Sequence, residues 1–265
     1  MTKTIIVGGG IAGLTLARIL GEQGRDVTVL EKEDVVGGLA RSFKYGDFIF
    51  DLGPHRFHTD RPAISDFIGD VLGDEAETIA RKSGVWMFNR NFSWPLHPSV
   101  MFGLPPSVLF RVGLDLITTV YQRREIINFE DYIMNMYGRT LYEVFFKDYT
   151  EKFLGLSPSE THVDWARTGI DRAIIDKRLK MNSLMDLVIN TLFKPKKETL
   201  FIYPKYGIGV FSQMLADMIT GQGNTVVTGT AVDKLKIKDD GDKKRIKAVK
   251  AGKTWYEADE VVRTA

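Results

Sequence analysis

The first eighty residues combine short apolar runs with one amphipathic segment. The pattern predicts a strand over Thr4–Val7, a helix from Ile11 to about Gly21 and a second strand over Asp26–Leu30, with a glycine-rich turn before the helix. A strand, a helix and a second strand within about 30 residues form a βαβ unit. The two strands are therefore expected to pair in parallel, through a right-handed crossover.

From about Arg81 to Lys197 the apolar and aromatic residues recur every three or four positions, which indicates helices. The pattern predicts helices over Ser107–Gln122, Glu130–Tyr137 and Thr140–Leu154. This region has the character of an inserted helical domain.

Two local signals add boundaries within the helical region. Asn128 can cap the helix that Gly138 ends. Residues 157–160, with the sequence Ser-Pro-Ser-Glu, have the spacing of a capping box and a proline at the first helical position. They predict the start of a further helix.

From about Leu200 onward the pattern is of α+β type, with a helix over Val210–Thr220, a strand over Thr225–Val227 and short strands on either side of the acidic turn 239–242. We interpret the lysines of this region as a solvated hairpin face rather than an anion-binding patch: Lys234, Lys236, Lys238, Lys243, Lys244, Lys247 and Lys250. The predicted organisation is one discontinuous domain, residues 1–80 and 200–265, with residues 81–199 inserted between its parts.

Composition narrows the function classes. The chain has 265 residues, and 36 basic against 34 acidic side chains give a formal net charge of +2, too little to favour nucleic acid as a partner. There is no cysteine, which removes disulfides, thiolate metal sites and thiol redox chemistry. No spacing of His, Asp and Glu suggests a metal site. A cytoplasmic location is expected.

The longest charge-free stretch, Asn91–Phe110, approaches the length of a membrane span. It contains Pro95, Pro98, Pro105 and Pro106, which a lipid-exposed helix would not tolerate. We therefore expect no transmembrane helix. The open alternatives are a buried wall of a ligand cavity and a segment that contacts a membrane peripherally.

The turn after the first strand carries the clearest chemical signal. Residues 8–13 contain GxGxxG between the predicted strand and helix, and Glu31 closes the second strand eighteen residues after the last glycine. Gly8 permits a tight turn, Gly10 lets the backbone approach a pyrophosphate, and Gly13 allows close packing of helix and strand. Glu31 can accept the ribose hydroxyls, and an acid at this position favours NAD or FAD over a 2′-phosphorylated cofactor.

The residues that follow decide between NAD and FAD. Val36-Gly37-Gly38-Leu39-Ala40-Arg41-Ser42 and the later Phe50–His58 segment, with the sequence FDLGPHRFH, resemble the FAD-dependent superfamily of protoporphyrinogen oxidase, monoamine oxidase, phytoene desaturase and UDP-galactopyranose mutase. In that superfamily a second-strand acid and a paired-glycine segment lie along FAD, and the Asp-x-Gly segment passes its flavin ring. The resemblance implies an α/β fold, with a Rossmann-like FAD-binding domain built of a parallel sheet plus a β-meander, and an inserted, largely helical substrate domain. The cofactor-binding residues that it implies are Gly8, Gly10, Ile11, Ala12, Gly13, Glu31, Lys32, Gly38, Leu39, Ala40, Arg41, Gly53, Pro54, His55, Arg56, Phe57 and Val232.

Later segments extend the resemblance over essentially the whole chain. Tyr149–Gly155 is similar to a YTEKxxG segment of the mutases, residues 203–209 resemble the segment that returns the chain to the flavin domain, and Ala258–Ala265 resembles the strand beneath the dinucleotide. The resemblance implies the following substrate-domain walls: Trp165, Arg172, Tyr203 and Tyr206. Members of the superfamily carry a further C-terminal half that this chain does not contain. A truncated chain, or a partner that supplies the remainder, is expected.

His55 is the predicted catalytic residue, because the GPHRFH segment aligns with the segment beside the flavin ring in the mutases. Its imidazole could hydrogen-bond near the flavin N5 or carry a proton at neutral pH, or the residue could shape the turn through its backbone alone. Arg41 and Arg56 could pair with phosphate or flavin oxygens, or form surface ion pairs. His58 and His97 are weaker candidates.

The primary functional hypothesis is an FAD-dependent oxidoreductase of the protoporphyrinogen oxidase and amine oxidase type, acting on a small-molecule substrate. The first alternative is an isomerase of nucleotide sugars like UDP-galactopyranose mutase, with no net redox change. The second is a dinucleotide-binding module without turnover. The sequence does not predict the substrate, the electron acceptor or the oligomeric state.

Overall fold

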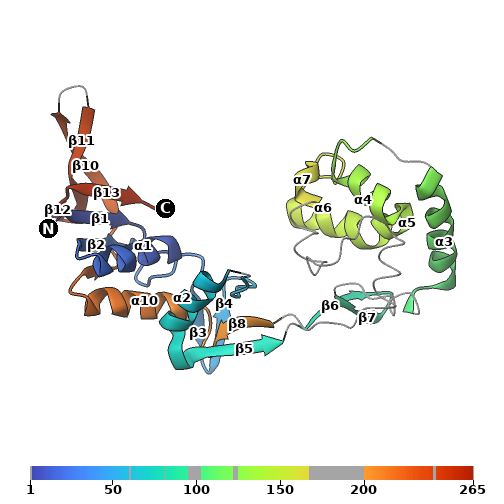
Figure 1. Cartoon of the computed structure of the whole chain (residues 1–265), viewed down its shortest axis with the longest axis horizontal. Helices are drawn as coiled ribbons and strands as arrows, with labels where there is room; N and C mark the ends of the chain where they lie inside the picture. Colours follow the sequence, from blue (N-terminus) through green and yellow to red (C-terminus); the bar gives the residue numbers. More distant parts are fainter. Residues whose placement is uncertain are drawn as a thin grey trace. The chain divides into compact units, whose positions relative to one another are not determined.

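A computed structural model gives the structure of the chain and describes residues 2–59, 61–80, 82–94, 103–121, 125–166, 200–240 and 243–264. The chain forms two compact units (Figure 1). Unit 1 consists of Met1–Ala80 and Thr199–Ala265, and unit 2 consists of Arg81–Glu198.

Unit 1 is built on a four-stranded sheet of order β13-β1-β2-β9, in which all neighbours run parallel. The strands are β1 (Lys3–Val7), β2 (Asp26–Leu30), β9 (Thr225–Val227) and β13 (Glu260–Arg263). Helix α1 (Ile11–Glu22) connects β1 to β2. The predicted βαβ unit and the α/β fold class are confirmed.

Helices cover one face of this sheet. Helices α1 and α10 (Gly209–Gly221) lie on the strands, and α2 (Pro62–Leu72), which is followed by the short 3-10 helix η1 (Gly73–Glu75), packs against α10. Ile6 and Val29 point from the sheet into a core with Leu14, Phe211 and Leu215, all of them buried. Removing these apolar side chains from water is the main stabilising contribution of this layer.

An antiparallel meander covers the other face of the sheet. Its strands are β10 (Val232–Asp240), β11 (Lys243–Ala251) and β12 (Thr254–Glu257). Ile5 and Leu30 pack there against Val249 and Ala251, so alternate residues of β1 and β2 serve opposite layers. The hairpin strands β10 and β11 have nine residues each, longer than predicted, and the hairpin extends beyond the parallel sheet (Figure 1).

Two antiparallel ribbons complete unit 1. Strands β3 (Ser42–Tyr45) and β4 (Phe48–Asp51) pair with Ser42 opposite Asp51, and β5 (Ala76–Ala80) pairs with β8 (Leu200–Pro204). The pairing of β5 with β8 joins the two parts of unit 1 where the chain leaves for unit 2 and returns from it.

Unit 2 has its own apolar core, formed by aromatic and aliphatic side chains that include Phe92, Phe129, Ile133, Tyr142 and Phe146. Its described elements are β6 (Ser83–Met87), β7 (Arg90–Trp94), α3 (Pro106–Tyr121), α4 (Phe129–Tyr137), α5 (Arg139–Leu141), the π-helical segment η3 (Tyr142–Lys147), α6 (Asp148–Leu154) and α7 (Val163–Trp165). The three helices predicted for this region are confirmed, with α5, η3 and α6 forming the third.

Asn128 caps α4 as predicted, because its side-chain oxygen accepts a hydrogen bond from the Asp131 amide at 2.9 Å. The helix ends at Gly138, whose φ of 82° lies in the left-handed region that favours glycine.

The helix start predicted at residues 157–160 is wrong, because these residues form a turn. The Ser157 amide donates to the Glu160 carboxylate at 3.4 Å, which is one half of a capping box. The chain then pairs with the start of α4, where the Phe129 amide donates to the Thr161 carbonyl at 2.9 Å. This tertiary pairing overrides the local signal.

No helix in the described part of the chain is both long enough and apolar enough to cross a membrane. Part of the charge-free stretch that prompted the question, from Pro95 to Phe102, lies outside the described residues.

Candidate functional site

The glycine turn lies at the carboxyl end of β1. Gly8 has a φ of 112°, which only glycine adopts readily, and its amide donates to the Leu30 carbonyl at the end of β2 at 2.9 Å. A Cβ on Gly13 would lie 2.0 Å from the Gly8 carbonyl oxygen and 2.9 Å from the Thr264 Oγ1. Gly8 and Gly13 together bring the first turn of α1 against the strand.

Gly10 faces open space. A Cβ built on it meets no atom of the described residues within 4 Å, although Gly10 directly precedes α1. The helix has no side-chain cap and no acidic residue in its first turn, so the amides of Ile11, Ala12 and Gly13 and the positive end of the helix dipole are available to an anion. Open space before an uncapped helix N-terminus fits a pyrophosphate.

Glu31 lies against this turn and is only 6% exposed. One carboxylate oxygen accepts from the Gly9 amide at 2.6 Å and the other from the Glu33 amide at 3.0 Å. These bonds fix the carboxylate beside the turn, and each oxygen keeps a further lone pair for a hydroxyl group. The neighbouring Lys32 is exposed, with its ammonium 3.7 Å from Glu33.

The paired-glycine segment crosses the glycine turn. The Gly37 amide donates to the Gly9 carbonyl at 2.8 Å, and a Cβ on Gly38 would lie 3.5 Å from the Gly10 Cα. Of the two residues that follow Gly38, Leu39 is 79% exposed and Ala40 is buried.

Arg41 follows the paired glycines, and its side chain lies near a carboxylate and an aromatic ring. Its guanidinium is 3.5 Å from the Glu33 carboxylate and 5.6 Å from the centroid of the Phe43 ring. Its Nε is buried and has no hydrogen-bond partner among the residues that the structure describes. A buried donor without a partner is unfavourable, so this side chain has capacity for an anionic ligand.

The segment around His55 follows β4. The His55 amide donates to the Gly53 carbonyl at 2.8 Å, and its side chain is partly exposed. Pro54 and Arg56 are exposed, and the Arg56 guanidinium lies 5.6 Å from the centroid of the Phe201 ring. Phe57 is fixed by two hydrogen bonds with Ile202 of β8, each of 3.0 Å.

Val232 begins β10, and the two residues Gly229 and Thr230 shortly before it contact the segment around Glu31. The Thr230 amide donates to the Glu31 carbonyl and the Gly229 amide to the Glu33 carbonyl, both at 2.8 Å. The structure thus gathers the glycine turn, the acid, the paired glycines and the start of β10 at the carboxyl ends of β1 and β2, where open α/β sheets bind their ligands.

A polar cluster that no sequence pattern predicts lies next to these segments. We call it the Asp51 cluster: Ser42, Asp51, Tyr203 and the amides of Ile208 and Gly209. The Asp51 carboxylate accepts from the Ser42 hydroxyl at 2.6 Å and from the Tyr203 hydroxyl at 2.5 Å. Partial burial and the bond to Asp51 raise the pKa of Tyr203 to about 12. The Tyr203 hydroxyl is therefore a neutral donor committed to Asp51.

The other predicted substrate residues are placed differently. Tyr206 is exposed in the loop between β8 and α10. Trp165 belongs to unit 2, where its ring stacks on Phe153 and Phe153 stacks on Tyr149, with centroids 5.9 Å apart in both pairs. All three rings are exposed, so the stack offers apolar ring faces to a ligand. Arg172 lies outside the described residues.

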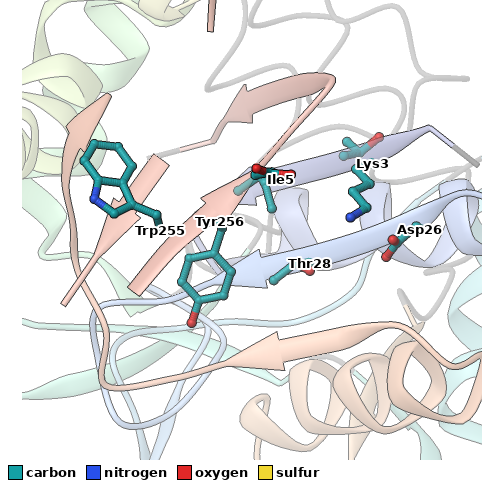
Figure 2. Close-up of a pocket in the computed structure, with 8 residues that line it drawn as sticks. Lys3, Ile5, Asp26, Thr28, Trp255 and Tyr256 are labelled. Carbon is teal, nitrogen blue, oxygen red and sulfur yellow. The ribbon is translucent and has the colours of Figure 1, made fainter. Parts of the chain in front are cut away.

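A concave surface is located away from the glycine turn. A shallow hollow of about 320 Å³ is lined by Lys3 and Ile5 of β1, Asp26 and Thr28 of β2, and Trp255 and Tyr256 of β12 (Figure 2). Because it lies at the amino ends of β1 and β2, it is not the cofactor position predicted for this fold. Within the described ranges, no group of three or more His, Cys, Asp or Glu side chains could hold a metal ion.

Residues 6–71 match the NAD(P)-binding Rossmann-like domain. A protein from Klebsiella pneumoniae assigned as a UDP-galactopyranose mutase is 28% identical over 165 residues, which cover 59% of this chain and 42% of that protein. The dTDP-fucopyranose mutase of Escherichia coli is 26% identical over 182 residues, covering 60% of this chain and 44% of that protein. An L-amino-acid oxidase from Sistrurus catenatus edwardsii is 33% identical over 89 residues, covering 34% of this chain and 17% of that protein.

Two solved structures share the fold. A reduced UDP-galactopyranose mutase superposes with a TM-score of 0.77 at 21% identity, covering 100% of this chain and 56% of that one. A protein from Exiguobacterium sp. 255-15 assigned as a protoporphyrinogen oxidase gives a TM-score of 0.68 at 17% identity, covering 100% of this chain and 59% of that one. The chain therefore spans little more than half of these structures, and its matches extend over less than half of the two mutase sequences. It contains a Rossmann-like dinucleotide-binding domain within an α/β fold that a sugar mutase and an oxidase share.

Proposed function

We propose that unit 1 binds FAD at the carboxyl ends of β1 and β2. The observation that carries this proposal is the open space over Gly10 at the uncapped N-terminus of α1, beside the buried Glu31. The pyrophosphate would lie on Gly10 and the first amides of α1, and the adenosine ribose on Glu31. Arg41, whose buried Nε has no hydrogen-bond partner among the described residues, would face an anionic part of the cofactor.

FAD supplies hydride transfer or electron-pair chemistry when it is bound. The chain's own contribution is to bind and orient the cofactor, and to present proton-carrying groups beside its ring. The candidate group is the partly exposed His55 imidazole, whose ring nitrogens can donate or accept a hydrogen bond. Its backbone is held by the bond to Gly53, so the imidazole projects from a fixed turn.

For the reaction, we propose nucleotide-sugar isomerisation of the mutase type, carried out by a protein that also contains the second half of the fold. The similarity to the two mutases spans 59% and 60% of the chain. A continuous match of that length must include the middle of the chain, which lies in unit 2. The exposed stack of Tyr149, Phe153 and Trp165 belongs to that unit and could pack against a substrate ring.

Oxidation of a small-molecule substrate is the second candidate, and it is the hypothesis that the sequence alone placed first. It is favoured by the full-length superposition on the structure assigned as a protoporphyrinogen oxidase, with a TM-score of 0.68. The L-amino-acid oxidase match covers only 34% of the chain, so it bears on cofactor binding more than on the substrate.

Gly10→Val tests cofactor binding. Gly10 has φ −73° and ψ 174°, a conformation that valine adopts, and an added Cβ meets no atom of the described residues within 4 Å, so the variant should fold normally. The side chain would occupy the pyrophosphate position, and we expect retention of FAD to be lost in the visible absorption spectrum of the purified protein. Gly69→Ala, also open within 4 Å, is the matched control. A Gly10→Val protein that stays yellow would falsify the site.

The two reactions are separated by anaerobic reduction followed by addition of UDP-galactopyranose. Ring contraction of the sugar without net consumption of reductant supports the mutase. A flavin that an organic substrate reduces in the absence of oxygen, in a protein that does not act on the sugar, supports the oxidase. A protein that binds FAD but does neither is a dinucleotide-binding module that needs the rest of the fold.

A further inference from the structure

We propose that Asp51 is a positioning residue that holds the two segments facing the cofactor, residues 37–41 and 53–57, in a fixed relation to each other and to α10. The inference rests on the proposed FAD site and adds to it a residue that does not touch the cofactor.

The hydrogen bonds of Asp51 join parts of the chain that are far apart in sequence. Its carboxylate accepts from the Ser42 hydroxyl at 2.6 Å, the Tyr203 hydroxyl at 2.5 Å and the Ile208 amide at 3.2 Å. The Ser42 hydroxyl in turn accepts from the Gly209 amide at 2.8 Å. One carboxylate therefore connects β3, β4, the end of β8 and the start of α10.

The start of α10 explains why an acid is needed at this position. The helix has no side-chain cap from its own sequence and no acidic residue in its first turn. Asp51 and Ser42 take over that role from a separate hairpin, since they accept from the Ile208 and Gly209 amides. The negative charge lies at the positive end of the helix dipole, which stabilises it.

Both cofactor-facing segments continue directly from this cluster. Ser42 follows Arg41, and Asp51 lies two residues before Gly53. Ser42 and Asp51 are the paired end residues of the β3–β4 hairpin, so the two segments leave the hairpin at the same end. Movement of this pair would move both segments together.

The packing leaves little room for an alternative arrangement. A Cβ on Gly207 would lie 2.4 Å from the Ser42 Oγ and 3.0 Å from the Asp51 Oδ1, and a Cβ on Gly209 would lie 2.8 Å from the Ser42 amide nitrogen. The loop between β8 and α10 thus approaches the hairpin closely, with glycine at both contact points. Tyr203, which the resemblance suggested as a substrate wall, acts here as a donor to Asp51.

Asp51→Asn tests the proposal, because it keeps the size of the side chain and removes its charge. The matched control is Asp47→Asn, at an exposed acid in the turn of the same hairpin. The first readout is amide hydrogen exchange of the protein without FAD. In Asp51→Asn we expect the exchange rate to rise about tenfold or more at residues 37–41, 53–57 and 208–211 together, because a hydrogen bond to a charged group is lost. In Asp47→Asn the exchange rate should stay unchanged.

The second readout is the affinity for FAD and the visible circular dichroism of the bound flavin. Asp51→Asn should weaken FAD binding about tenfold and alter the dichroism, while Asp47→Asn should match the wild type. Should Asp51→Asn not fold, Tyr203→Phe removes a single donor to the same carboxylate and should raise exchange in the same three segments to a smaller extent.

The outcomes separate this inference from the FAD proposal. A wild-type chain that does not bind FAD, together with raised exchange in the Asp51→Asn protein, overturns the FAD proposal and leaves the positioning role in place. Unchanged exchange in both Asp51→Asn and Tyr203→Phe, or a rise confined to residues 208–211, overturns the positioning role.

Discussion

Gly13 occupies a point where α1 crosses the end of β1 and where no side chain fits. The Gly8 carbonyl oxygen would lie 2.0 Å from an added Cβ, and this atom belongs to backbone that cannot rotate away. A Cβ added to Gly10, three residues earlier, meets no atom of the described residues within 4 Å. The same residue type therefore serves internal packing at one position and access for a ligand at the other.

Gly13→Ala should destabilise unit 1 by about 3 kcal/mol, because α1 must move off the strand to accommodate the methyl group. Urea unfolding measures the change in the free energy of unfolding. Gly69→Ala in α2, where nothing lies within 4 Å, should instead stabilise the protein by about 0.5–1 kcal/mol. Equal effects of the two substitutions would show that α1 does not pack as described.

The ionisation of Tyr203 should lower the free energy of unfolding at alkaline pH. Its pKa is raised from 10.0 to about 12 in the folded protein, chiefly by burial and then by the bond to Asp51. The folded state holds this proton more tightly than the unfolded state, so the stabilisation is complete below pH 10 and is lost as the pH rises from 10 to about 12. Tyr203→Phe should flatten that loss in urea unfolding across this range, and Tyr206→Phe should keep the wild-type profile.

At the scale of elements, the backbone amides at the starts of helices find hydrogen-bond acceptors in two different ways. Helix α4 is capped by the residue that precedes it, Asn128, as the local sequence predicts. Helix α10 is capped by Asp51 and Ser42, more than 150 residues earlier in the chain, and no local signal announces this. The turn at residues 157–160 shows the reverse case, in which a local signal is present and no helix forms.

Asn128→Ala should lower the stability of unit 2 by about 1 kcal/mol, since the Asp131 amide loses its acceptor. Thermal or urea unfolding followed by far-ultraviolet circular dichroism measures the loss. Asn128→Asp keeps an acceptor and should retain wild-type stability. Similar losses in both variants would mean that Asn128 acts through another contact.

At the scale of the molecule, the chain consists of two units with separate apolar cores. Unit 1 carries every described residue of the proposed FAD site, and unit 2 carries the exposed aromatic stack. Binding of the cofactor should therefore act on the two units unequally.

FAD at about one hundred times its Kd should stabilise unit 1 by about 2.7 kcal/mol. Hydrogen exchange measured by mass spectrometry should show protection of β1 and β2 rising about a hundredfold, with little change in α4 of unit 2. The Gly10→Val protein should show no rise in either unit. Equal protection of α4 and β2 would indicate that the two units respond to the cofactor as one body.

Much of the fold is predictable because its signals are local. The period of apolar residues gives β1, α1, β2 and the helices of unit 2, and the glycine spacing gives the turn on which the cofactor proposal depends. The length of the β10–β11 hairpin was underestimated, because the acidic turn marks where the hairpin reverses but not how far its strands continue. The predicted site residues themselves stay predictions until the FAD experiments are done.

The sequence by itself determined the βαβ unit, helix α10, strand β9, the main helices of unit 2 and the glycine turn with its acid, since each depends on residues within a few positions of one another or on one βαβ unit. It did not predict α2 or the ribbon strands β3 to β8. Only the tertiary structure decided that Asp51 meets Ser42, Tyr203 and the start of α10, and that Tyr203 is a donor to Asp51. The physical reason is that a hydrogen bond between residues 152 positions apart depends on how the chain packs, and no local pattern encodes it.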